Sequence, residues 1–286
     1  PEPEQMGVAF SNFAKKRKSV GVSAPIVTPG DFARSSIAPR DPRLPTPSIE
    51  SALKTLAIGD ETGRKINPWD PKLRKKIMEE AGTMLNRHDF DKPSGKLRVG
   101  SKLDAGGEIY AVNAEIGKGG FATVYLVTAE DTSKPLALKW ETPSCEWEVY
   151  ILEQLRKRIK DKNIMKSIML VTDAYIFTNC SMIMSEYLPL GTLLQLSNAM
   201  PDPYWRITVF LGIQMATILK DVHNAMIVHG DAKPDNWMIT KKIDENSDVD
   251  ELLSSRYLRL IDWGRAIDMK ALGGRNLYGR AGTEQF

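Results

Sequence analysis

One ten-residue segment constrains this chain more than any other part of it. Residues 227–236 read Ile-Val-His-Gly-Asp-Ala-Lys-Pro-Asp-Asn, and Asp262-Trp263-Gly264 follows at the end of an apolar run, 26 positions after Asn236. Any one of these polar residues is an ordinary turn residue. Their types and their order, however, match the groups that transfer of a phosphoryl group requires.

Each of those groups can be assigned to a side chain. Phosphoryl transfer needs a carboxylate to accept the hydroxyl proton, positive charge beside the γ-phosphate and hard oxygen ligands for magnesium. Asp231 is the candidate carboxylate and Lys233 the candidate positive charge. Asn236 and Asp262 are the candidate metal ligands. His229 is more typical of a packed structural residue than of an acid or base.

A glycine-rich segment between two predicted strands offers a place for phosphates, because glycines let a backbone approach them and present its N–H groups. A hairpin of this kind is by itself more often structural, and here Ala122 replaces the last glycine of the protein kinase pattern. The later motifs support the functional reading. The candidate nucleotide contacts in this segment are Gly117, Lys118, Gly119, Gly120, Phe121, Ala122 and Val124.

A lysine on the third predicted strand strengthens that interpretation. Ala137-Leu138-Lys139 occupies the place where the kinase pattern has a lysine that neutralises the α- and β-phosphates and pairs with a helix carboxylate. Glu148 is the first candidate for that carboxylate and Glu146 the second. A lone strand lysine is ordinarily a solvated edge charge, and only its distance from the glycine-rich segment favours a functional role.

Apolar periodicity predicts two lobes. Alternation predicts three antiparallel strands from Ile109 onward and two more over 167–177 and 181–187, with a helix over 146–160. After a hinge at 186–191 the pattern becomes helical, most clearly over 205–224. The expected fold is α+β: a bilobal eukaryotic protein kinase fold with a five-stranded antiparallel N-lobe and a partial helical C-lobe.

Composition divides the chain into four regions. Residues 1–65 are rich in Pro and Ser without a sustained period, which predicts a disordered linker. Residues 66–109 form an N-terminal extension, 110–187 the kinase N-lobe and 188–286 a partial C-lobe that ends in the activation segment. The chain opens on Pro1 and stops within a recognisable element, so we expect both ends to be cuts in a longer protein whose missing helices would support activity.

The extension is expected to contain a short packing helix. Asp70 can cap it and Pro71 can begin it, and Trp69 is expected to anchor it on a neighbour. Its body is predicted to run through the apolar residues Leu73, Ile77, Met78 and Leu85.

Charge and cysteine content exclude several other classes of protein. The net charge is +3, with 39 Lys+Arg against 36 Asp+Glu, so no global field favours nucleic acid or an anionic membrane. No apolar run reaches the roughly 18 residues of a membrane helix. The two cysteines lack metal-like spacing, which fits a reduced intracellular compartment. We expect neither direct nucleic-acid nor membrane partners.

Within the kinases, the chain resembles the Bub-type mitotic-checkpoint serine/threonine kinases over about residues 67–286. The residues that carry this resemblance are Asn67-Pro68-Trp69-Asp70, Trp147-Glu148-Val149-Tyr150-Ile151, Gly191-Thr192-Leu193-Leu194, His229-Gly230-Asp231 and Ile267-Asp268-Met269-Lys270.

The resemblance implies an ATP- and magnesium-dependent kinase that acts in the spindle assembly checkpoint and in chromosome segregation. It implies protein substrates, among them a nucleosomal histone tail, and kinetochore and checkpoint partners. It also implies location in the nucleus, at the kinetochore or centromere in mitosis, and in the cytoplasm. Lys15-Lys16-Arg17-Lys18 is compatible with a nuclear import signal, although so short a basic run is more often part of a linker.

For the site, the kinase pattern implies that Val124, Ala137 and Met238 enclose the adenine, while Glu186 to Leu188 offer it hydrogen bonds. Gly230 stands where the common pattern has an arginine that pairs with an activation-loop phosphate. We therefore expect activity that does not depend on such a phosphate, with the extension bracing the small lobe instead.

Two other functions remain open. The chain is either a kinase or an inert truncated kinase or pseudokinase scaffold that binds checkpoint partners, and intact Lys139, Asp231, Asn236 and Asp262 argue against decay by mutation. A small-molecule kinase of similar fold is the third hypothesis. By resemblance, Lys233 between base and metal ligand favours protein hydroxyls.

Overall fold

A seven-stranded sheet forms one lobe of the structure, a computed structural model that describes residues 66–82, 86–199, 205–242, 252, 255–273 and 277–278. The predicted linker of residues 1–65 lies outside these ranges. The strands run in the order β1-β6-β7-β5-β4-β3-β2, and only the β1–β6 pair is parallel. Their bounds are β1 Arg87–Asp89, β2 Lys102–Ala105, β3 Glu108–Lys118, β4 Ala122–Ala129, β5 Pro135–Glu141, β6 Val171–Ile176 and β7 Ser181–Glu186.

The prediction of five antiparallel strands is two strands short. β1 and β2 were missed, and both lie in residues that the sequence analysis assigned to the extension. β1 has three polar residues, none of them buried, so it carries no alternating apolar signal. The strand predicted over 167–177 is shorter, because α5 (Lys162–Met165) and a loop precede β6.

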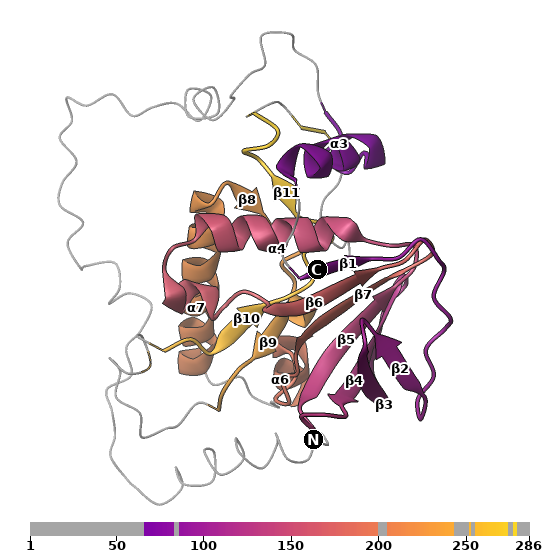
Figure 1. The fold of residues 1–286 in the computed structure, drawn as a ribbon. Helices are drawn as coiled ribbons and strands as arrows, with labels where there is room; N and C mark the ends of the chain where they lie inside the picture. The colour runs from indigo at the N-terminus through magenta and orange to yellow at the C-terminus, as the bar shows by residue number, and fades with distance from the viewer. Residues whose placement is uncertain are drawn as a thin grey trace, which may run out of the picture.

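Helix α4 (Glu146–Arg158) lies across one face of the sheet and is buried on several sides (Figure 1). Trp147, Ile151 and Leu155 belong to a core that continues into the helical lobe through Ile218 and Trp237. A second core, which includes Tyr110, Val127 and Met182, lies within the sheet lobe and reaches Leu97 of the extension. Through this core, helix α4 packs against the helical lobe as well as against the sheet.

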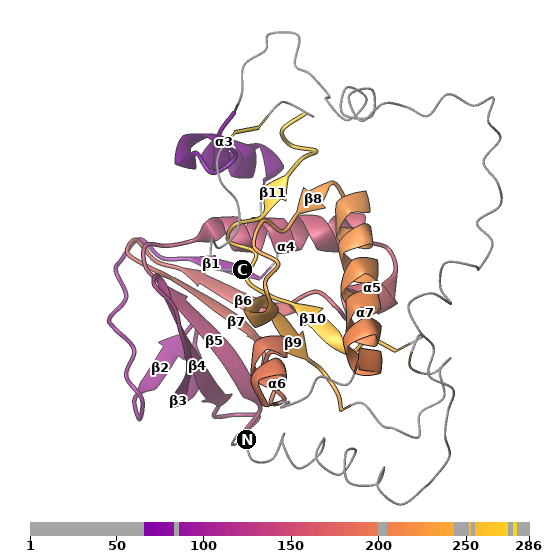
Figure 2. The ribbon, with the colours of Figure 1, turned by 180° about the vertical axis from the view of Figure 1, so that it is seen from behind.

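In the described residues, the second lobe contains the helices α6 and α7 and two short pairs of strands (Figure 2). α6 spans Leu193–Ala199 and α7 spans Trp205–Asn224, close to the predicted helix. The one-turn helix η3 covers Pro234–Asn236. β8 (Ile227–Val228) pairs with β11 (Ile267–Asp268), and β9 (Trp237–Ile239) pairs with β10 (Leu258–Leu260). These pairings place the His229 segment beside the Asp262 segment.

The extension helix α3 (Pro71–Ala81) begins as predicted. The Asp70 side chain accepts hydrogen bonds from the backbone N–H groups of Lys72 and Leu73, and Pro71 occupies the first helical position. The helix ends at Ala81, with Gly82 as its cap, so it stops before Leu85, which lies outside the described residues. In both ribbon views α3 lies against α4 on the side away from the sheet.

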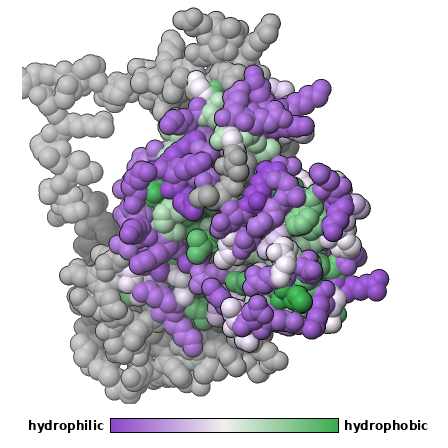
Figure 3. Space-filling view, in the orientation of Figure 1, coloured by the Kyte–Doolittle hydropathy of each residue, from purple (hydrophilic) through white to green (hydrophobic). Residues whose placement is uncertain are grey.

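The visible surface is mostly hydrophilic, with apolar residues in small separate areas (Figure 3). Within the part of the chain that the structure describes, no helix combines the length and the apolar character needed to cross a membrane.

Candidate active site

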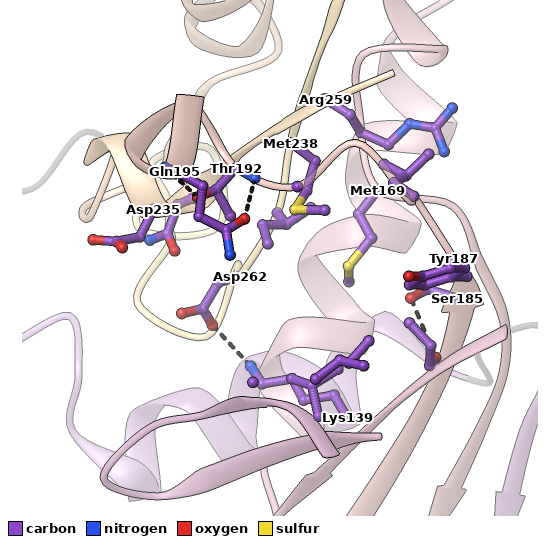
Figure 4. A pocket seen from close by; sticks show the side chains of 18 of the residues that line it. Lys139, Met169, Ser185, Tyr187, Thr192, Gln195, Asp235, Met238, Arg259 and Asp262 are labelled. Atoms are coloured by element: carbon purple, nitrogen blue, oxygen red, sulfur yellow. Dashed lines mark hydrogen bonds and ion pairs between the residues drawn. The ribbon is translucent and has the colours of Figure 1, made fainter. Parts of the chain in front are cut away.

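A cleft of about 1050 Å³ lies between the two lobes. Lys139 and Asp262 face one another inside it, with Asp235 on one side and Tyr187 on the other (Figure 4). The cleft lining brings together most of the predicted site residues, namely Gly117, Lys118, Gly119, Ala122, Val124, Ala137, Lys139, Glu148, Glu186, Leu188, Lys233, Asn236, Met238 and Asp262.

Three predicted site residues are not part of that lining. Gly120 and Phe121 lie at the tip of the glycine-rich turn, where the Gly119 N–H donates to the Ala122 carbonyl at 2.7 Å. Phe121 is 73% exposed, so its contact with a nucleotide stays a prediction. Asp231 lies deeper and is only 7% exposed.

Lys139 is the centre of an ionic network. Its Nζ lies 2.6 Å from Glu148 Oε2 and 2.8 Å from Asp262 Oδ1. A third carboxylate, that of Glu141, approaches to 3.2 Å. Glu146, the second candidate partner, instead forms an ion pair with Arg87 of the extension at 2.8 Å. The geometry therefore selects Glu148.

The electrostatics of this network follow from its burial. Burial lowers the pKa of Lys139, but Glu148, Asp262 and Glu141 outweigh that effect and hold the pKa well above its ordinary value. Burial acts to raise the pKa of Asp262, yet Lys139 outweighs it and the pKa is lowered. Lys139 and Asp262 are therefore both charged at neutral pH. Burial raises the pKa of Glu141.

Glu148 also joins α4 to the metal motif. Its second oxygen, Oε1, accepts a hydrogen bond from the backbone N–H of Trp263 at 3.0 Å, and Glu148 is fully buried. Asp262 adopts a left-handed backbone conformation with φ of 62°. The Trp263 ring packs edge to face on His229, with ring centroids 4.6 Å apart.

The catalytic-loop residues form a second connected group. Lys233 Nζ lies 3.4 Å from Asp231 Oδ2, and Asn236 Nδ2 donates to the Asp231 carbonyl at 2.7 Å. His229 is 1% exposed, and its two ring nitrogens bond to the Ile261 carbonyl and the Asp231 N–H. Because burial lowers the pKa of His229, its ring is neutral and positions the loop, as its sequence context indicates.

Asn236 and Asp262 suit a divalent cation by the chemistry of their donor atoms. The amide nitrogen of Asn236 is engaged with Asp231, which leaves the amide oxygen for a cation. The carboxylate of Asp262 is ionised, and both side chains line the cleft. Hard cations such as Mg²⁺ prefer oxygen donors of this kind.

The hinge side of the cleft contains residues that the sequence analysis missed. Arg259 forms an ion pair with the Glu186 side chain, and its Nε donates to the Lys166 carbonyl at 3.0 Å. The side chain of Glu186 is thus occupied by this ion pair. The other lining residues that had no predicted role include Ile116, Met169, Leu170, Ser185, Thr192, Gln195, Asn198, Asp235 and Ile261.

Some of these residues carried a signal and others did not. Ser185 and Tyr187 flank Glu186 in the hinge, and Glu141 lies two positions after Lys139 on a strand, where side chains share a face. Met169 and Ile261 come from loops without a recognisable motif. Backbone bonds between distant segments hold them at the cleft, from Met169 N to Leu260 O at 3.1 Å and from Ile261 N to Asn236 O at 3.0 Å.

The extension contacts the start of the activation segment. Trp69 Nε1 donates to the Arg265 carbonyl at 3.1 Å, while Arg74 donates to the carbonyls of Gly264 and Ala266 at 3.0 and 3.3 Å. Arg74 also stacks over the Trp147 ring of α4. Trp69 thus anchors the helix as expected, and Arg74 contacts both the segment after Asp262 and helix α4. Bracing of the small lobe by the extension stays a prediction.

Comparison with known proteins agrees with this architecture. Residues 110–286 match the family described as Protein kinase domain. The mitotic checkpoint serine/threonine-protein kinase bub-1 of Caenorhabditis elegans is 45% identical over 77% of this chain and 23% of its own length. The spindle assembly checkpoint serine/threonine-protein kinase BUB1 of Saccharomyces cerevisiae is 34% identical over 58% of this chain and 18% of its own.

A solved structure supports the same assignment. The crystal structure of the BubR1 kinase domain matches with a TM-score of 0.63 and 27% identity, over 72% of this chain and 63% of that one. The chain spans only about a fifth of the length of the nematode, budding-yeast and mouse checkpoint kinases that it matches. The chain therefore belongs to the protein kinase family, whose members use ATP and a divalent metal, and residues 110–286 form its kinase domain.

Proposed function

We propose that this chain is the catalytic part of a mitotic-checkpoint serine/threonine protein kinase, which transfers the γ-phosphate of ATP to protein hydroxyls with Mg²⁺ as the metal. The observation that carries the proposal is the assembled contact of Lys139 with Glu148 and Asp262 inside the cleft, at 2.6 and 2.8 Å. Protein kinases need both a lysine–glutamate pair and a metal-binding aspartate in place before they transfer phosphate.

Each residue has a role that its position permits. Asp231 accepts the proton of the attacking hydroxyl at its carboxylate, and Lys233 supplies positive charge 3.4 Å from that carboxylate. Lys139 neutralises phosphate charge, while Val124, Ala137 and Met238 enclose the adenine. Asn236 and Asp262 would hold Mg²⁺, which supplies charge stabilisation to the phosphates when it is bound.

The checkpoint role rests on relatives rather than on the site. The matched proteins from the nematode and the yeast are named checkpoint kinases. We extend that role to this chain and with it the expectation of a histone tail as substrate, kinetochore proteins as partners and a nuclear location. The division at residues 66, 110 and 188 into extension, N-lobe and C-lobe is part of the same proposal.

Transfer of labelled γ-phosphate from Mg-ATP to histone tests the proposal directly. The chain and the full-length protein would each be assayed beside an Asp231→Asn control, with ADP binding measured in parallel. We expect transfer by the full-length protein and loss of at least a hundredfold in kcat in the control, on the order of the contribution of a general base. Nucleotide binding without transfer would instead favour a scaffold.

A further inference from the structure

Asp268 is a buried carboxylate whose acceptor positions are filled. It is 1% exposed, and its Oδ1 and Oδ2 accept from Arg158 at 2.9 and 2.6 Å. Oδ2 also accepts from the Tyr150 hydroxyl at 2.8 Å. The backbone N–H groups of Lys270 and Ala271 each donate to Oδ1 at 3.0 Å. Five N–H or O–H groups thus donate to one carboxylate, which fixes the position of Asp268.

The partners of Asp268 connect it to α4, the helix that carries Glu148. Tyr150 and Arg158 lie eight positions apart and therefore face the same side of that helix. Arg158 also donates to the Ala225 carbonyl at 3.1 Å, at the turn after α7. One guanidinium thus joins α4, the activation segment and the helical lobe.

Helix α4 is consequently held at two points, by a residue of the metal motif and by a residue that follows the motif. Towards its N-terminus, Glu148 accepts from the Trp263 N–H. At its C-terminus, Arg158 binds Asp268, six positions after Asp262. A buried ion pair costs desolvation energy that surface charges do not, so this pair is weak support for stability but a strong constraint on geometry.

Gly230 fits this arrangement. Its φ is +78°, and a β-carbon there would stand 2.6 Å from the Arg265 carbonyl oxygen. The backbone therefore excludes an arginine side chain at this position. An arginine adjacent to the catalytic aspartate is the group that would otherwise pair with an added phosphate. In this protein the activation segment carries the permanent negative charge of Asp268 instead. The arginine that pairs with it is Arg158 of α4.

We propose that Asp268 is a positioning residue for phosphoryl transfer, a permanent negative charge on the activation segment that holds α4 through Arg158. It keeps Glu148 against Lys139 without any modification, as a phosphate does in kinases switched by phosphorylation. This inference rests on the proposed kinase function.

A pair of variants in the full-length protein separates positioning from folding. Asp268→Asn removes the charge, keeps the shape and leaves the partly buried Arg158 without the carboxylate that it binds. Asp268→Asn combined with Arg158→Met leaves no buried charge, so it is expected to regain stability. We expect kcat to fall about tenfold in both, equivalent to roughly 1.4 kcal/mol, while the Kd for ADP stays within about twofold. Glu130→Gln, which breaks the surface pair with Lys102, is the matched control.

Hydrogen exchange of residues 146–158 gives a readout that needs no activity. We expect amide hydrogens across α4 to exchange faster than in the wild type in both Asp268 variants. The control variant is expected to exchange at the wild-type rate. If the double variant regained both stability and wild-type kcat, Asp268 would serve folding alone and the proposal would fail. Loss of wild-type activity on phosphatase treatment would also overturn it. A wild-type protein without transfer activity would refute the kinase function, and the exchange of α4 would still decide whether Asp268 anchors the helix.

Discussion

The carbonyl oxygen of Arg265 lies 2.6 Å from the point where a β-carbon on residue 230 would stand, so only glycine fits at Gly230. The same carbonyl accepts the indole N–H of Trp69. This carbonyl of the activation segment therefore contacts both the extension, at Trp69, and the catalytic loop, at Gly230. The glycine before Asp231 is explained by this close approach, rather than by the loss of an arginine alone.

Substitution of this glycine is therefore expected to disturb both stability and catalysis. Gly230→Ala adds a left-handed strain and a backbone clash, and we expect it to destabilise the protein by about 1–3 kcal/mol and to lower kcat. Denaturant unfolding and initial rates measure the two effects. Gly212→Ala on α7 is the control. Among the described residues, no atom outside the local helix backbone lies within 4 Å of its added methyl, and alanine should stabilise the helix by about 0.5–1 kcal/mol. Equal effects of the two changes would contradict this account.

Two glutamates on α4 should respond very differently to loss of charge. Glu148→Gln weakens the only glutamate contact that α4 makes with Lys139 among the described residues, and we expect kcat/KM to fall about a hundredfold. Glu146→Gln removes a partly exposed pair with Arg87, so kcat/KM is expected to stay within about twofold. Steady-state kinetics with ATP varied measures both. A larger loss from Glu146→Gln would show that the extension pair matters more than the cleft pair.

Most of the site could be predicted because the residues that carry its chemistry lie close together in short sequence motifs. Asp231, Lys233 and Asn236 fall within six consecutive residues, and η3 and the turn before it bring them together locally. Lys139 was predictable from its strand. The choice between Glu146 and Glu148 was not settled by spacing, since both lie in the first turn of α4, and the structure decides it by turning Glu148 inward.

The parts that sequence reasoning missed depend on contacts between distant segments. β1 has no apolar alternation, and its place at the sheet edge is set by its pairing with β6 and by His88 stacked on Tyr175. Arg259 was not singled out, because nothing in β10 indicates that its guanidinium reaches the hinge. Asp268 stood within a resembling motif, yet its five donors come from two segments. Pairings of this kind are tertiary and leave no local period.

The extension is expected to control the order of the activation segment. Arg74→Met removes three hydrogen bonds, to the carbonyls of residues 68, 264 and 266, and the stacking on Trp147. We therefore expect a loss of about 1–3 kcal/mol in stability and faster hydrogen exchange over 262–268. Lys75→Met, one position along and 76% exposed, is the control and should change neither. Unchanged exchange in Arg74→Met would show that α3 is a packing helix without influence on the site.

The ion pair of Asp268 also predicts how stability depends on pH. Burial acts to raise the pKa of Asp268, but hydrogen bonds from Arg158, from the Ala271 N–H and from Tyr150 outweigh it, and the pKa lies below the ordinary 3.8.

A carboxyl whose pKa is lower in the folded state than in the unfolded state contributes stability above its unfolded pKa. That stability is lost as the pH falls through the folded pKa. The difference in unfolding free energy between wild type and Asp268→Asn should therefore be constant from pH 7 to 5 and shrink below about pH 4. Urea unfolding at pH 7, 5 and 3.5 measures it, with Glu130→Gln as the control for net charge. A difference that grew in acid would mean that the folded state disfavours the ionised carboxylate, which would contradict the lowered pKa.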